Sequence, residues 1–502
     1  MPFCYYLRVA DQLISDPAEE INLEIVKKRT VSGVVALTFR TFFLQIVGLA
    51  AFGVYGSLFE IAQLGTYSLV LAVKNFLSYF SDIGLAGALI QKKEALTDED
   101  LKSTFLIQQS LVIFLLVVLF FATPFLQDFY KWSDEIVYLL WALGVSFFIS
   151  SLRTIPTVIL ERKLQFEKLI IPQIADTIVF NATVIYLATQ GFGLTSFTVG
   201  VLLQALVGLV LTYILQPWTP GFAFSKSALK TLLRFGVPYQ TNTFLAMLKD
   251  DGLILVLGRI LGDSGIGLLM WGQKWGQAPL RFFMDQVIKV TFPAFSRLQS
   301  KEDELANAVS RAVFFVCFLV FPAVIGLAIL APVIIEIVPR YAKWQPALFA
   351  LSMFGTSALF AAVTTPLTNA LNAIGKIKIT FYLMIMWTIL NWLLIPYLAI
   401  NYGINGAAVG YALVSASSVV AIIIIRKYVS FTLGTPVLKP LVASLGMGII
   451  LLIIRNMMPP SLQWVVILLV FGGLVYSFGI LLLVGQTLLK DARKVFYALI
   501  KR

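Results

Sequence analysis

The chain has 502 residues, of which 59% are hydrophobic and only 13% are charged. Soluble proteins carry about 25% charged residues, so this composition excludes an ordinary soluble domain and predicts a polytopic, all-α membrane protein. The chain has no histidine and only two cysteines, which excludes histidine chemistry and gives no basis for a disulfide framework. The acidic N-terminal residues do not fit a signal peptide.

Fourteen apolar segments follow one another along the chain, and most have the roughly 20–28 residues that a tilted membrane-spanning helix needs. Turn signals such as Gly191-Phe-Gly193 and Gly262-Asp-Ser-Gly265 separate them. The eighth segment is longer, which predicts a helix that continues past the bilayer or one that is kinked near Pro279. The segments are 31–55, 61–89, 104–126, 137–160, 169–190, 194–216, 235–259, 264–296, 308–338, 346–373, 377–400, 403–425, 438–454 and 463–486.

The lysines and arginines give these spans an orientation. If the N-terminus is cytoplasmic, 26 of the 38 basic residues fall on the inner side, five on the outer side and seven within the membrane. This asymmetry is a strong positive-inside signal, and it predicts cytoplasmic N- and C-termini. The net charge of +12 therefore reflects topology and attraction to anionic lipids, and it is no indication of nucleic-acid binding. The five outer residues are Lys131, Arg259, Arg340, Lys343 and Arg455.

An internal repeat relates the two halves of the chain. The second span holds Lys74 and Asp82, and the eighth span, about 200 residues later, holds Lys274, Arg281 and Asp285; a short charged loop follows each. Both copies start on the inner side, so the repeats run parallel, as in transporters whose substrate site lies between the halves. The alternative is chance similarity between two hydrophobic helices.

The repeat predicts the division of the chain. Spans 1–6 form an N-lobe, spans 7–12 a C-lobe, and spans 13 and 14 lie outside the repeat. Cytoplasmic segments flank the lobes, and the linker between them has an amphipathic pattern. The predicted parts are residues 1–30, the N-lobe 31–216, the linker 217–234, the C-lobe 235–426, spans 13–14 in 427–488 and the tail 489–502.

Several stretches resemble a known family. Residues 80–93 (FSDIGLAGALIQKK) with 96–101 (LTDEDL), residues 291–297 (TFPAFSR) and residues 403–410 (GINGAAVG) resemble bacterial polysaccharide repeat-unit flippases. These belong to the multidrug/oligosaccharidyl-lipid/polysaccharide exporter superfamily, and the resemblance covers about residues 25–490.

The resemblance implies two six-helix lobes that face each other in a V and open alternately to each side of the bacterial inner membrane. It implies undecaprenyl-pyrophosphate-linked oligosaccharide as cargo, for assembly of an exopolysaccharide or another surface polysaccharide. Polysaccharide polymerase and export machinery would be partners. The family needs no cofactor, and coupling to an H⁺ or Na⁺ gradient is left open.

Charged residues at membrane depth are the candidate functional groups, because an ion at the bilayer centre costs about 3 kcal/mol or more. Basic groups would bind the pyrophosphate, and carboxylates would serve gating or ion coupling. The alternative is that these charges pair with one another and hold helices together, while Lys289 snorkels to the interface. The predicted substrate-binding residues are Arg40, Lys74, Arg153, Lys249, Lys274 and Arg281, and the predicted gating or coupling residues are Asp82, Asp176, Asp250 and Asp285.

Other functions compete with this interpretation. A lipid II flippase would share the fold and a cationic cavity, and a cation-coupled drug antiporter would favour an acidic cavity. A membrane glycosyltransferase or polymerase would place catalytic acids or bases in large outer loops. The loops here are short, and their acidic residues are scattered and form no acid/base pair. The sequence shows no P-loop and no metal-ligand cluster, and we expect neither a catalytic site nor a metal site.

Overall fold

The computed structural model describes residues 23–80, 84–92, 96–221, 223 and 247–485. All regular elements in these ranges are helical, and eleven helices are long and apolar enough to cross a membrane. The chain forms two compact units, residues 1–264 and 265–502. The predicted linker, the N-terminal segment and the C-terminal tail lie largely outside the described residues.

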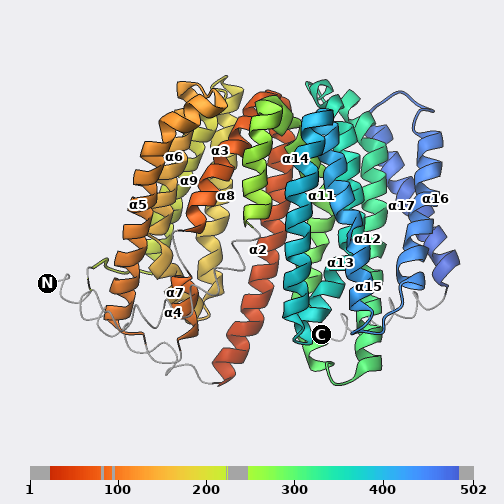
Figure 1. Cartoon of the computed structure of the whole chain (residues 1–502), viewed down its shortest axis with the longest axis horizontal. Coiled ribbons are helices and arrows are strands. Elements are labelled where there is room, and N and C mark those ends of the chain that lie inside the picture. The colour runs from red at the N-terminus through yellow and green to blue at the C-terminus, as the bar shows by residue number, and fades with distance from the viewer. Residues whose placement is uncertain (1–22, 81–83, 93–95, 222, 224–246, 486–502) are drawn as a thin grey trace. The chain divides into compact units, whose positions relative to one another are not determined.

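The first unit is a bundle of long apolar helices (Figure 1). Within it, α8 packs against α9 and α2, α6 packs against α9, and α3 packs against α6. The start of α11, preceded by the π-helical turn η1, belongs to this unit as well. The elements are α2 (Leu23–Leu58), α3 (Ile61–Tyr79), α4 (Leu85–Gln91), α5 (Asp98–Tyr130), α6 (Asp134–Ser151), α7 (Thr154–Arg162), α8 (Phe166–Thr189), α9 (Thr195–Leu215), η1 (Leu248–Gly252) and α11 (Leu253–Arg297).

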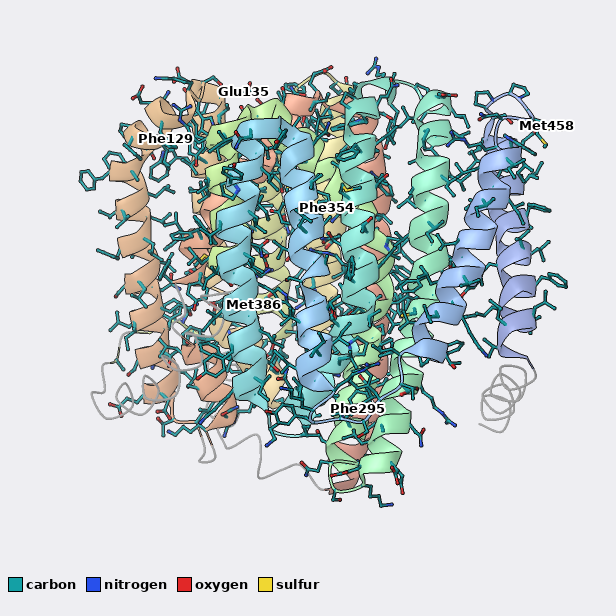
Figure 2. The ribbon with its side chains drawn as sticks, turned by 45° about the vertical axis from the view of Figure 1, so that its right-hand side comes forward. Phe129, Glu135, Phe295, Phe354, Met386 and Met458 are labelled. Carbon is teal, nitrogen blue, oxygen red and sulfur yellow. The ribbon has the colours of Figure 1, made fainter. Side chains whose placement is uncertain are left out.

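The second unit holds the rest of α11 and the helices that follow it. Its core lies around α13, which packs against α12 and α14, and Phe354 of α13 is fully buried there (Figure 2). The two last helices pack against each other, and α16 also contacts α12. The elements are α12 (Glu302–Ile337), η2 (Ala342–Ala347), α13 (Leu348–Ala373), α14 (Ile377–Ala416), α15 (Ser418–Ile425), η3 (Gly434–Leu438), α16 (Lys439–Ile454) and α17 (Leu462–Val484).

Two long helices contain a break where the sequence predicts a turn between spans. Gly262 in α11 has φ 67°, and Gly403 in α14 has φ 62°, a backbone conformation that glycine adopts without strain. Beyond Gly262, α11 stays helical through Pro279 to Arg297, which agrees with a helix that extends past the bilayer. The number of fourteen spans stays a prediction, since three of the predicted segments are not counted separately among the eleven helices.

Two of the predicted spans are divided into shorter helices. In the segment 61–89, α3 ends at Tyr79, and α4 begins after Gly84, which has φ 72°. The segment 137–160 divides into α6 and α7. Pro156 explains the second break, because its ring would clash with the carbonyl of Leu152 in an unbroken helix.

The charged stretch after α4 is a helix start. Thr97 accepts a hydrogen bond from the Asp100 backbone N–H, and the Asp100 carboxylate accepts from the Thr97 N–H, which forms a capping box for α5. Lys92 lies 2.7 Å from the same carboxylate. Arg162 of α7 donates to the carbonyls of Leu89 and Lys92 at the end of α4. These residues therefore fix α4, α5 and α7 to one another.

Candidate functional site

One face of α8 carries polar side chains through the first unit. Gln173, Asp176, Thr177 and Asn181 follow one another at helical spacing in an otherwise apolar span. The Arg40 guanidinium of α2 donates to Oε1 of Gln173 at 2.6 Å, and the Tyr55 hydroxyl donates to Oδ1 of Asn181 at 2.7 Å. This face therefore supplies acceptors at membrane depth.

The ion pair between Arg153 and Asp176 occupies the centre of this face. Nη1 of Arg153 lies 2.7 Å from Oδ2 of Asp176, and the two side chains are 24% and 6% exposed. Arg153 stands at the break between α6 and α7, so its position depends on Pro156. A Cβ atom at Gly208 of α9 would lie 2.1 Å from Arg153 Nη1 and 2.2 Å from Asp176 Oδ1. The absence of a side chain at Gly208 therefore makes room for the pair.

A cavity of about 310 Å³ opens beside this ion pair. Polar groups from α6, α7, α8 and α9 form much of its wall, so a polar ligand can be bound there without loss of hydrogen bonds. Arg153 is the basic residue among them. The lining residues are Ala86, Ser150, Arg153, Thr154, Thr157, Val158, Leu160, Glu161, Leu169, Pro172, Gln173 and Thr212.

Lys74 of α3 lies in different surroundings. It is half-buried and lines a small cavity whose other walls are apolar side chains and Gly144. It forms no ion pair with any residue that the structure describes, although it lies within electrostatic range of Arg153 and Asp251. Lys74 and Arg153 thus lie in one region of the first unit. The sequence predicted that both lie at membrane depth, but it did not predict that they are near each other.

The acids of η1 behave differently from one another. Asp250 pairs with Lys249, which agrees with the alternative that these neighbours neutralise each other. Asp251 instead accepts a hydrogen bond from Nδ2 of Asn75 at 3.3 Å and so connects η1 to α3. Asp251 is not among the site residues predicted from the sequence. π-Helical turns occur frequently at functional sites, but no sequence signal here distinguishes the two acids.

In the second unit, two glycines determine which face of α11 is covered. Cβ atoms at Gly272 and Gly276 would lie 2.9 and 2.6 Å from backbone atoms of Leu351 in α13. Such small residues allow two helix backbones to approach closely. Lys274 and Arg281 lie away from this contact and are exposed. Arg281 donates to Oε1 of Gln277 at 3.3 Å.

The remaining predicted residues, on α11 and near the end of the second span, give little information about the site. Asp82 lies outside the described residues, and so does the side chain of Asp285. Lys289 is exposed near the end of α11, in a position compatible with snorkelling.

Comparison with known proteins places the chain in a family. Residues 58–348 match the family described as polysaccharide biosynthesis protein, which is more than half of the sequence. The chain belongs to this family. Among relatives, the teichuronic acid biosynthesis protein TuaB of Bacillus subtilis is 22% identical over 71% of this chain and 74% of TuaB. The succinoglycan biosynthesis transport protein ExoT of Rhizobium meliloti is 23% identical over 77% of this chain and 79% of ExoT.

A solved structure supports the fold of this family member. The lipid II flippase MurJ, in an inward closed conformation, superposes with a TM-score of 0.75 and 17% identity, covering 93% of this chain and all of MurJ. The predictions of an all-helical transporter fold and of membership in the polysaccharide branch are therefore confirmed. The protein is a multi-pass membrane transport protein of polysaccharide biosynthesis, and the glycosyltransferase and polymerase alternatives were wrong.

Proposed function

We propose that this protein is a flippase for undecaprenyl-pyrophosphate-linked oligosaccharide repeat units. It moves them from the inner to the outer leaflet of the bacterial cytoplasmic membrane for assembly of a surface polysaccharide. The observation that carries the proposal is that basic side chains lie at membrane depth in both units of a family member of polysaccharide biosynthesis. Keeping such charges in a span costs about 3 kcal/mol each, so they are expected to line a polar path.

Different side chains suit different chemical groups of the cargo. Arg40 and Arg153 suit the pyrophosphate because a guanidinium offers forked donors, and Lys74, Lys274 and Arg281 add positive charge along the path. The charge of Lys249 is offset by its pair with Asp250. The hydroxyls of Thr154 and Thr157 beside Arg153 suit sugar hydroxyl groups. The prenyl tail stays among the lipids, because no binding energy is gained by transferring it from one apolar phase to another.

The Arg153–Asp176 pair gives a mechanism for alternating access. An arriving pyrophosphate competes with the Asp176 carboxylate for the Arg153 guanidinium, since both ligands accept the same donors. Loss of the pair leaves a buried carboxylate, which favours uptake of a cation or proton. Asp176 thereby acts in ion coupling, together with Asp250, while Asp82 and Asp285 act in gating. The N- and C-termini are cytoplasmic in this proposal, and the polymerase acts on the delivered product.

A deletion strain tests the function. We expect repeat-unit lipid to accumulate with its sugar on the inner leaflet and surface polysaccharide to be lost. Plasmid-borne wild-type protein should restore both, whereas Arg40→Gln, Lys74→Gln and Lys274→Gln should restore neither despite normal membrane insertion. Normal surface polysaccharide in the deletion strain would refute the flippase assignment, and full restoration by all three variants would refute the assigned path.

A lipid II flippase is the second candidate, favoured by the likeness to the MurJ fold. Purified protein in proteoliposomes separates the two. Equal amounts of fluorescent lipid II and of a lipid-linked repeat unit are offered, and transfer is measured by accessibility to an added glycosidase or to a membrane-impermeant quencher. Faster transfer of lipid II would replace the proposed cargo. Transport of a drug cation and of neither lipid would favour the antiporter.

A further inference from the structure

A second cavity in the first unit lies at the end of α5 that is predicted to face outward. It has a volume of about 390 Å³ and forms where the end of α5 meets the segment around Gly262. Phe129 marks this end of α5 in Figure 2. None of the residues proposed to line the transport path lines this cavity. Its lining residues are Phe129, Tyr130, Lys131, Gly258, Arg259, Leu261, Gly262, Asp263 and Ser264.

Arg259 is the strongest ligand-binding group in this cavity. Its guanidinium carbon lies 5.2 Å from the centre of the Phe129 ring, and the residue is exposed. It forms no hydrogen bond or ion pair with another residue in the described parts of the chain. A guanidinium has five N–H donors in a fixed fork, and an exposed contact with a ring contributes only about 0.5–1 kcal/mol. Arg259 therefore has donors available for an anion.

Lys131 supplies a second basic group from a conformation that is unfavourable for lysine. It ends α5 with φ 58°, where glycine is preferred and other residues are strained by about 1 kcal/mol or more. A lysine at a helix C-terminus also benefits from the helix dipole. Its partner Asp128 is 84% exposed, and such exposed pairs contribute only about 0–1 kcal/mol. The Lys131 ammonium can therefore turn to a ligand at little cost.

No ion pair joins Arg259 to an acid among the described residues. Asp263, which also lines the cavity, accepts a hydrogen bond from the Thr66 hydroxyl at 2.8 Å, and Asp128 pairs with Lys131. Two of the five basic residues predicted on the outer side gather in this one cavity. The aromatic side chains of Phe129 and Tyr130 flank them. This combination of a forked donor, a second cation and aromatic walls suits a phosphate that carries an organic group.

We propose that Arg259 and Lys131 form a binding site for the phosphate of a lipid headgroup at the outer surface. The outward assignment rests on the proposed function and orientation, whereas phosphate binding itself does not. In the transport cycle, the site would receive the diphosphate of the translocated lipid once it has left the path. The same chemistry would also admit an ordinary anionic phospholipid or free phosphate, and the experiment separates these sources.

Hydrogen–deuterium exchange of the full chain in nanodiscs tests the site, because it reports protection segment by segment. The probes are farnesyl diphosphate, inorganic pyrophosphate and nanodiscs that contain phosphatidylglycerol. We expect farnesyl diphosphate to protect the segments 126–133 and 255–264. Arg259→Gln should weaken the apparent affinity at these segments about tenfold or more, as expected for loss of a charge-assisted hydrogen bond of about 1.5 kcal/mol or more. Arg259→Lys should retain part of it.

A matched variant locates the effect. Arg340→Gln, at another residue of the predicted outer side, should leave the protection of the segments 126–133 and 255–264 as in the wild type. Protection by inorganic pyrophosphate or phosphatidylglycerol alone would assign the site to free or phospholipid phosphate. No protection of the two segments by any probe, or equal protection in Arg259→Gln, would overturn the proposal. Protection that persists in a protein without flippase activity would leave this site standing while refuting the proposed function.

Discussion

The basic residues of the two units are held in opposite ways. In the first unit, Arg40 and Arg153 reach acceptors on a neighbouring helix, Gln173 and Asp176 of α8, at 2.6 and 2.7 Å. In the second unit, Arg281 reaches Gln277 of its own helix and stays exposed. Arg40 and Arg153 are thus part of helix packing, whereas the packing of α11 against α13 uses glycines on another face.

The two repeats thus place charged residues at a similar depth but use them differently in packing. In the first repeat, α3 ends at Tyr79, and a short helix follows. In the second, α11 continues to Arg297. Removing a charge should therefore destabilise the first unit and leave the stability of the second unchanged.

Asp176→Leu should have the largest effect. It leaves the Arg153 guanidinium in the protein interior without its carboxylate, and breaking a buried pair costs about 3–5 kcal/mol. We expect a strong fall in the thermal unfolding temperature of the detergent-solubilised protein, followed by tryptophan fluorescence. Membrane yield should fall as well.

The double variant Arg153→Met/Asp176→Leu is the control for this prediction. Replacing both charges by apolar groups of similar size should restore most of the lost stability. Flippase activity should remain absent, because Arg153 is proposed to contact the cargo. A double variant as unstable as Asp176→Leu would contradict the ion-pair explanation, and full activity would make Arg153 purely structural.

Gly276→Ala should destabilise the second unit through packing. The new methyl group would lie 2.6 Å from the Leu351 carbonyl oxygen and 2.9 Å from Cβ of Phe354, so the backbones of α11 and α13 must separate. Overpacking of this kind costs about 2–3 kcal/mol. Gly446→Ala in α16 is the matched control, since no atom lies within 4 Å of its added Cβ. A fall in unfolding temperature of the same size in both variants would disprove the close-packing argument.

Part of this arrangement can be predicted from the sequence, and the reasons are local. The fifth and sixth spans, predicted at 169–190 and 194–216, correspond to Phe166–Thr189 and Thr195–Leu215, because Gly191-Phe-Gly193 separates the two apolar runs and Pro217 follows the second. The break before α7 could have been predicted from Pro156. The contact between Arg153 and Asp176 could not, because it depends on how two helices pack.

The two acids of η1 show a further limit. Asp250 and Asp251 are neighbours in the sequence, and successive residues of a helix point in directions about 100° apart. The π-helical turn changes the phase of the helix, so the ordinary helical period does not predict which acid faces α3. Asp251, which contacts Asn75, was therefore missed, and Asp250 was selected instead.

Gln173→Ala should have a smaller effect on stability than either change above. It removes the acceptor of the Arg40 guanidinium, whose buried Nε already has no hydrogen-bond partner among the described residues. Loss of a hydrogen bond to a charged group costs about 1.5 kcal/mol at the low end. Gln173→Glu offers Arg40 a carboxylate, so the unfolding temperature should stay as in the wild type. Flippase activity should fall, because the new carboxylate neutralises the positive charge of Arg40. High activity in Gln173→Glu would show that the charge of Arg40 does not serve the cargo.

Lys274→Gln and Arg281→Gln should have the smallest effect on stability, about 0.5 kcal/mol or less, as for surface substitutions. Their side chains lie away from the contact of Gly272 and Gly276 with α13, so that close contact is kept. Flippase activity should nevertheless fall severely, because a cation in a membrane span costs about 3 kcal/mol and both cations are proposed to line the path of the cargo. Export is measured as surface polysaccharide and stability as the unfolding temperature of the same preparations. A loss of activity that parallels a loss of stability would remove the contrast between the units, because the second unit's cations would then be structural too.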